Sequence, residues 1–169
     1  MDRLWAPWRM DYVTTASKKA GCVFCDALEI NDDRRSHILF RGRLNFVIMN
    51  IYPYNSGHVM IVPFEHVASP LEAPEGQTEE MVDLLKLCQA ALARAYKAEG
   101  FNIGMNIGKC AGAGVLDHYH LHIVPRWGGD TNYITVLGET RVLAEELDSS
   151  YNRLLPHFER ASERPEDLP

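Results

Sequence analysis

Short apolar runs separated by turn residues predict several β-strands along this chain. Residues 38–40 and 46–50 are two such runs, and the Arg-Gly-Arg sequence at 41–43 between them is typical of a tight turn. Residues 57–63, Gly-His-Val-Met-Ile-Val-Pro, predict a buried strand that ends at the proline. A further strand is expected over residues 101–106, before a glycine-rich loop.

A helical period replaces the strand pattern between residues 78 and 99. Glu79 and Glu80 favour the N-terminal end of such a helix, and Gly100 is a natural stop after it. One apolar stripe recurs at helical spacing, and we expect it to face the core: Met81, Leu84, Leu85, Cys88 and Leu92. Nearer the C-terminus, the pattern predicts a short strand over 133–137 and a second helix over 140–155.

Strands in hairpin order around one long helix predict an α+β fold, in which an antiparallel sheet has the long helix and a C-terminal helix packed on it. We expect one structural domain with three segments. Residues 1–21 form an N-terminal aromatic segment that contains Trp5 and Trp8, and residues 22–137 form the central domain. Residues 138–169 form the C-terminal helix and tail.

The composition narrows the range of functions. The chain has 169 residues, 46% hydrophobic and 24% charged, which is enough to bury a core without disulfides. The net charge of −6 argues against non-specific binding to duplex nucleic acid, so a phosphate-bearing ligand needs a local site. Without a long apolar run or a secretory signal, we expect no membrane partner. The four cysteines then favour thiols or metal binding in a cytoplasmic protein.

The most informative motif is the histidine row at 118–125, His-Tyr-His-Leu-His-Ile-Val-Pro. Read as a strand, it puts the three apolar residues between the histidines on one face and the histidines on the other. Neighbouring imidazoles are then roughly 6.5–7 Å apart, at about 3.3 Å of rise per residue. Such a row can present neutral nitrogens to a phosphate group or to a metal ion at neutral pH.

Two other motifs are ambiguous when they are taken alone. The loop at 108–114 has three glycines in seven residues, and its amide hydrogens can approach an oxyanion, but a flexible hairpin connection has the same composition. Cys22-Val-Phe-Cys25 has a spacing that suits tetrahedral zinc, although redox chemistry or chance also gives such a pair. The strand–helix context that the redox interpretation requires is missing here.

The histidine row with the following Ile-Val-Pro-Arg resembles the signature of the histidine triad (HIT) superfamily of nucleotide hydrolases and transferases. Asn50 lies eight residues before His58, as in the nucleoside-binding strand and Gly-His turn of that family, and Pro63-Phe-Glu-His66 resembles its Pro-x-x-His. The resemblance covers residues 22–137, which are therefore expected to be the HIT domain. The Pro-Arg-Trp-Gly-Gly-Asp sequence at 125–130, with the Trp-Ala-Pro-Trp-Arg start, resembles the bacterial diadenosine-tetraphosphate phosphorylase-like branch.

The resemblance implies a role for each histidine of the site. His120 would attack the α-phosphate and form a nucleotidyl-histidine intermediate, which splits one difficult displacement into two steps. His122 would contact the same phosphate, and His58 would hold or orient it. Asn50 would bind the ribose, and apolar side chains would bracket the base, although Phe46 and Ile48 can equally be core residues of a strand. The full set of nucleotide contacts implied is Asn50, Phe46, Ile48, Asn106, Gly112, Gly114 and Trp127.

The resemblance also implies a metal site. In HIT proteins with such a cysteine pair, the Pro-x-x-His histidine and the first histidine of the triad complete the ligands. The corresponding set here is Cys22, Cys25, His66 and His118. Four protein ligands leave no open position, so this zinc would be structural.

The activity expected from the resemblance is phosphorolysis of dinucleoside polyphosphates, with inorganic phosphate as the second acceptor. Many hydrolases of the family carry Gln four residues before the first triad histidine, where this chain has Gly114. Hydrolysis of dinucleoside polyphosphates and cleavage of nucleoside phosphoramidates are the alternatives within the family. A non-catalytic nucleotide-binding or sensing protein is the alternative of another class, and a homodimer is expected because it is common in the superfamily.

Overall fold

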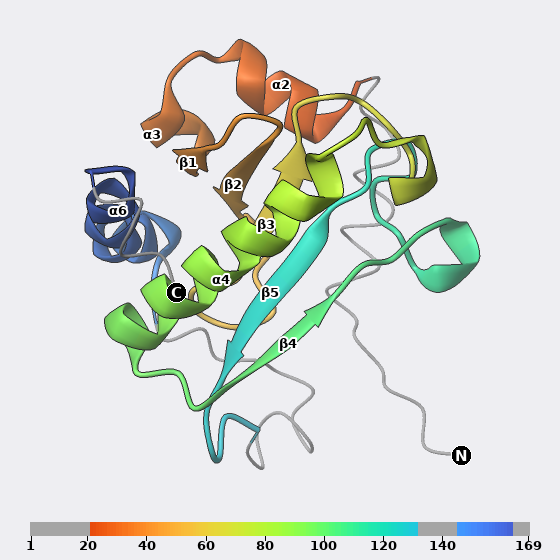
Figure 1. Cartoon of the computed structure of the whole chain (residues 1–169). Helices are drawn as coiled ribbons and strands as arrows, with labels where there is room; N and C mark the ends of the chain where they lie inside the picture. The colour runs from red at the N-terminus through yellow and green to blue at the C-terminus, as the bar shows by residue number, and fades with distance from the viewer. Residues whose placement is uncertain (1–20, 132–144, 164–169) are drawn as a thin grey trace, which may run out of the picture.

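One antiparallel sheet organises this computed structural model, which describes residues 21–131 and 145–163 (Figure 1). Five strands run in the spatial order β1-β2-β3-β5-β4, and each neighbouring pair is antiparallel. The strands are β1 (Ile38–Arg41), β2 (Asn45–Met49), β3 (Val59–Pro63), β4 (Gly100–Gly104) and β5 (Leu121–Arg126).

Helices cover both faces of this sheet. The longest, α4, lies over one face of the sheet in Figure 1, against β2, β3 and β5, and α6 packs beside it and against β1. The helices and 3-10 turns are α2 (Val23–Glu29), α3 (Asp33–Ser36), η1 (Pro70–Glu72), α4 (Gln77–Tyr96), η2 (Lys109–Ala111) and α6 (Leu147–Glu163). The expected α+β fold, with the long helix and the C-terminal helix packed on an antiparallel sheet, is confirmed.

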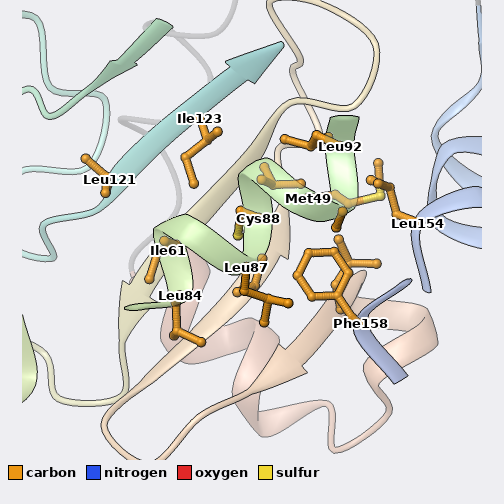
Figure 2. Close-up of a cluster of buried hydrophobic side chains, with 14 of the residues drawn as sticks. Met49, Ile61, Leu84, Leu87, Cys88, Leu92, Leu121, Ile123, Leu154 and Phe158 are labelled. Atoms are coloured by element: carbon orange, nitrogen blue, oxygen red, sulfur yellow. The ribbon is translucent and has the colours of Figure 1, made fainter. Parts of the chain in front are cut away.

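The larger core lies between the sheet and the two long helices. Figure 2 shows strand residues such as Ile61 and Ile123 converging with Leu92 of α4 and Phe158 of α6. Cys88 of α4 is fully buried in this cluster, as expected for its place on the apolar stripe. The stripe itself is broader than predicted, because Leu87 and Ala91 are also buried.

A smaller core covers the opposite face of the sheet. There, alternate residues of β2 and β3, such as Phe46 and Met60, pack with Phe24 and Ala27 of α2. Neighbouring strand residues therefore belong to different cores, so β2 and β3 are buried on both faces. This explains why the sequence pattern in these strands is a continuous apolar run and not an alternation.

The structure corrects several predicted boundaries. The long helix ends at Tyr96, not at 99, because Lys97 turns into the left-handed region at φ 51° and Gly100 already belongs to β4. Within the described residues, the C-terminal helix begins at Leu147, later than the predicted 140, and extends beyond the predicted end. Helices α2 and α3 were not predicted, since seven and four residues are too few to show a helical period.

Some predictions fall outside the described residues. These are the strand over 133–137, the first residues of the predicted C-terminal helix, and nearly all of the N-terminal aromatic segment. Among the helices that the structure describes, none combines the length and apolar character that crossing a membrane requires. The cytoplasmic location and the homodimer stay predictions.

The larger core yields a test of stability. Replacing Leu92, which is fully buried, by alanine is expected to lower the free energy of unfolding by about 2–5 kcal/mol, since the change leaves a cavity between helix and sheet. Val82→Ala is the matched control on the same helix, because Val82 is 52% exposed, and its effect should stay within about 0.5 kcal/mol. Equal midpoints of urea unfolding for the two variants would contradict this description of the core.

Candidate active site and metal cluster

The residues of the histidine row alternate between the two faces of the sheet, as predicted, although β5 begins only at Leu121. Tyr119, Leu121 and Ile123 belong to the larger core, whereas His122 pairs with Met60 on the opposite face of the sheet. His120 is closer to His122 than strand geometry predicted, with ring centroids 4.7 Å apart. His118 and His120 precede the regular strand, which lets their rings turn away from an ideal ladder.

His120 and His122 open onto a cavity of about 310 Å³ between α2, the end of β2 and the glycine-rich loop. Its apolar wall includes Phe24 and Ala27 of α2. Seven of the residues predicted from the sequence line this cavity: Ile48, Asn50, Asn106, Gly112, Gly114, His120 and His122. An apolar recess with a few convergent polar groups is the usual form of a small-molecule site.

Three predicted residues lie elsewhere. Phe46 is fully buried in the smaller core against Phe64, so the described structure does not support a contact between Phe46 and a base. Trp127 is not among the residues that line the cavity, and its indole N–H donates to the carbonyl oxygen of Tyr96 at 3.1 Å; its nucleotide contact stays a prediction. His58 is fully buried behind His122 and contacts it.

The hydrogen-bond partners of His58 assign the protons of the His58–His122 pair. The backbone N–H of Tyr54 donates to Nδ1 of His58 at 3.1 Å, so a neutral His58 carries its proton on Nε2. This Nε2 lies 3.0 Å from Nδ1 of His122 and donates to it. A neutral His122 therefore carries its proton on its own Nε2, where it can donate to an anion.

His120 has the opposite arrangement. Its Nδ1 lies 3.1 Å from the carbonyl oxygen of His118, which can only accept, so His120 carries its proton on Nδ1 and a lone pair on Nε2. Burial lowers the pKa of His120 and keeps the ring neutral, because desolvation penalises the charged form. A nucleophilic nitrogen and a proton donor thus stand side by side at one cavity.

The four predicted metal ligands gather at the N-terminal end of α2. Sγ of Cys22 and Nδ1 of His118 are 3.3 Å apart, as are Sγ of Cys25 and Nδ1 of His66. All four ligand atoms lie within 4.8 Å of one another. His118 donates from Nε2 to the carbonyl oxygen of Pro63 at 2.9 Å, which leaves the lone pair of Nδ1 directed at the cysteines.

The cysteines of this cluster are free thiols and not a disulfide. Burial and the neighbouring Cys22 raise the pKa of Cys25, because a second thiolate in this place is unfavourable without a compensating cation. Two sulfurs and two imidazole nitrogens that lie within 4.8 Å of one another are a donor set that suits tetrahedral zinc. The residues present therefore fit the metal that the sequence implied.

Two residues that the sequence interpretation passed over belong to this region. Phe24, between the two cysteines, places its ring 5.4 Å from that of His118 and 4.9 Å from that of His120. His37 also lines the cavity, and its Nε2 contacts the carboxylate of Asp148 on α6 at 3.0 Å. Phe24 was visible inside the Cys-x-x-Cys motif, whereas nothing near His37 in sequence indicated a partner more than a hundred residues away.

A buried chain of hydrogen bonds anchors the histidine segment from its other face. The hydroxyl of Tyr119 donates to the side chain of Gln77, whose amide donates to Asn45, and Asn45 donates to the carboxylate of Glu80 at 2.8 Å. Glu80 also accepts from the backbone N–H groups of residues 43 and 44. The chain thus links the residue between His118 and His120 to the start of α4 and to the β1–β2 turn.

The fold and the site together define the class of protein. A family model described as HIT domain matches residues 31–129, which is more than half of the chain. The chain therefore belongs to the HIT family, and it is an enzyme of the phosphorylase or hydrolase kind.

Individual relatives and solved structures agree with this assignment. An AP-4-A phosphorylase of Mycobacterium tuberculosis is 31% identical over 168 residues, covering 95% of this chain and 86% of the relative. An adenosine 5'-monophosphoramidase of Saccharomyces cerevisiae is 31% identical over 121 residues, covering 68% and 72%. A hypothetical histidine triad nucleotide-binding protein of Sulfolobus tokodaii has a similar structure, with a TM-score of 0.67 and 27% identity over 86% of this chain and 97% of the other. A Zn-bound histidine triad family protein of Mycobacterium smegmatis shares the fold with a TM-score of 0.61 and 21% identity, covering 90% and 94%.

The buried hydrogen-bond chain can be tested by removing its first hydroxyl. Tyr119→Phe is expected to lower the free energy of unfolding by about 1–3 kcal/mol, because it leaves the buried oxygen of Gln77 without this donor. Tyr96→Phe removes a hydroxyl that donates to Glu145, but Glu145 keeps its bonds to Ser150 and Arg153. The free energy of unfolding should therefore fall by less than about 1 kcal/mol in that variant. Denaturant unfolding measures both, and a larger loss for Tyr96→Phe would refute the ranking.

Proposed function

We propose that this enzyme transfers a nucleotidyl group from a dinucleoside polyphosphate to inorganic phosphate through a covalent intermediate on His120. The observation that carries the proposal is the pairing of opposite tautomers in one cavity. His120 offers a lone pair on Nε2, and His122 offers a proton on Nε2. A nucleophile and a donor so arranged suit attack on a phosphorus centre and the charge that then develops on its oxygens.

In the first step, Nε2 of His120 attacks the α-phosphorus of the substrate. The N–P bond forms as the P–O bond to the rest of the polyphosphate breaks, and the leaving oxygen departs with its electron pair. For diadenosine tetraphosphate, the leaving group is ATP and the enzyme retains an adenylyl group. His122 donates to a phosphate oxygen, and backbone amides near Gly112 and Gly114 are close enough to the cavity to assist.

In the second step, an oxygen of inorganic phosphate attacks the same phosphorus, and the N–P bond breaks. The product is ADP, and His120 regains its lone pair. Water in place of phosphate would give AMP. Gly114, which lines the cavity, brings no side-chain amide to this place, and this would favour an acceptor larger than water.

Two further observations support this choice of substrate. The relative from Mycobacterium tuberculosis, similar along 95% of this chain, is an AP-4-A phosphorylase. A binding or sensing protein has no need of an imidazole with its lone pair in the cavity, so the arrangement of His120 favours an enzyme.

Product analysis tests the proposal directly. With diadenosine tetraphosphate and inorganic phosphate, we expect ATP and ADP in equal amounts, and little turnover when phosphate is omitted. His120→Ala should lower kcat by about a thousandfold or more, because the covalent route is lost. His157→Ala, a change of the same kind on α6, should leave kcat unchanged. Release of ATP and AMP at a rate independent of phosphate would contradict phosphorolysis, and full activity of His120→Ala would contradict the covalent step.

We also propose that the cluster of Cys22, Cys25, His66 and His118 holds one structural zinc ion. The metal would tie the start of α2 to the segment that carries His120, and would offset the charge of the two thiolates. Two thiolates and two imidazoles are a donor set that zinc prefers. Because four protein ligands leave no coordination position for a substrate, the zinc would be structural. The protein of Mycobacterium smegmatis that shares this fold is itself Zn-bound.

Zinc removal should therefore act on stability. Metal analysis of the purified protein is expected to give one zinc per chain, and exhaustive chelation should lower Tm by more than about 10 °C, since structural zinc contributes several kcal/mol to folding. Cys25→Ser should lose the metal, whereas Cys110→Ser, which changes an exposed thiol outside the cluster, should retain it. Purified protein with far less than one zinc per chain, or an unchanged Tm after chelation, would overturn the assignment.

A further inference from the structure

We propose that Asn55 is a positioning residue for the active site. Asn55 holds the loop at 50–58 in place, so that the backbone N–H of Tyr54 fixes the position of the proton between His58 and His122. Asn55 does not line the cavity and touches none of the reacting atoms. The inference rests on the proposed function, because it assumes that His122 donates to the transferred phosphate. The proposal also gives a role to the Pro-Arg-Trp-Gly-Gly-Asp sequence at 125–130, which the chemistry of the histidines leaves unexplained.

The loop between β2 and β3 closes tightly on itself. At its base, Asn50 N–H donates to the carbonyl oxygen of His58 at 3.0 Å, and His58 N–H donates to the carbonyl oxygen of Asn55 at 3.2 Å. Within it, the side-chain oxygen of Asn50 accepts from Tyr52 N–H at 2.9 Å, and Tyr54 N–H reaches Nδ1 of His58. The side-chain amide nitrogen of Asn50 also lies 3.4 Å from Nδ1 of His58. Both donors that set the tautomer of His58 therefore belong to this loop, and their geometry depends on how the loop is held.

Asn55 attaches this loop to the far end of β5. Its side-chain amide donates to the carbonyl oxygen of Pro125 at 3.2 Å and to the carboxylate of Asp130 at 3.1 Å. Asp130 is itself fixed by Arg126, which donates to both of its carboxylate oxygens, and by Trp127 N–H at 3.3 Å. The carboxylate is nearly buried, with a side-chain exposure of 9%, so it offers Asn55 a rigid acceptor.

Loss of this attachment would act on the distribution of protons in the site. When the loop no longer holds the Tyr54 N–H and the Asn50 amide against Nδ1, a neutral His58 can place its proton on Nδ1, and its Nε2 then becomes an acceptor. Nδ1 of His122 must in turn become the donor, which moves the proton of His122 away from Nε2. The site would keep all its histidines in place but would lose the donor to the phosphate, at a cost to the transition state more than to binding.

The test is Asn55→Ala in the full-length protein, assayed with diadenosine tetraphosphate and inorganic phosphate. We expect kcat to fall by about 10- to 100-fold while KM changes less than about threefold, as for a misplaced catalytic group. Nitrogen-15 NMR of the histidine rings should show His58 passing from the Nε2–H tautomer to a mixture of both. Because this spectrum requires no turnover, it remains decisive even if the enzyme proves to be a hydrolase.

Asn102→Ala is the matched control. Asn102 accepts from the other side of the Arg126 guanidinium and does not touch the loop, so its loss should leave kcat and the His58 tautomer as in the parent protein. If Asn55→Ala does not fold, Asp130→Asn, which keeps the shape of the acceptor but removes its charge, carries the same readouts with a smaller expected loss of kcat. An unchanged His58 tautomer in the variant, or equal kcat for Asn55→Ala and Asn102→Ala, would overturn the proposal.

Discussion

The alternation of side chains along 118–123 is the constraint on which the rest of this structure depends. Tyr119, Leu121 and Ile123 must enter the core beneath α4, so the intervening histidines are forced to the face that α2 covers. A shift of one residue would bury imidazoles among aliphatic side chains and expose the core residues. The energy that holds the reactive face in register is therefore ordinary hydrophobic burial on the opposite side, reinforced by the hydroxyl of Tyr119.

The sequence allowed the sheet, the long helix, the gathering of two cysteines and two histidines, and most of the cavity lining to be predicted, because each leaves a local pattern or a motif. Where a residue lies elsewhere than the sequence suggested, the determinant was not local. Phe46 has the apolar character of a base contact, but only the pairing of β2 with β3 decides that its ring enters the smaller core. Trp127 follows the histidine row directly, yet the partner of its indole is the end of α4. Helix α2 is too short for a period, although it forms one wall of the site.

The proposed zinc site and the candidate active site share one short segment and one aromatic ring. His118 and His120 are separated by a single residue, and the ring of Phe24 contacts both. Because Cys22 and Cys25 lie at the start of α2, the same helix supplies ligands to the cluster and apolar wall to the cavity. The geometry of the two centres is thus established by the same few residues, and neither can be rearranged without the other.

The proton on Nδ1 of His120 is held by the carbonyl oxygen of His118, which belongs to the main chain. In many enzymes, a side-chain carboxylate has this orienting role, and its replacement alters the tautomer of the histidine. Here the orienting group does not depend on the identity of the side chain, since every amino acid at position 118 has a backbone carbonyl oxygen. Mutation can remove His120, the proposed nucleophile, or displace its segment, but it cannot delete the acceptor itself, so over evolutionary time this part of the proposed catalytic arrangement is protected from substitution.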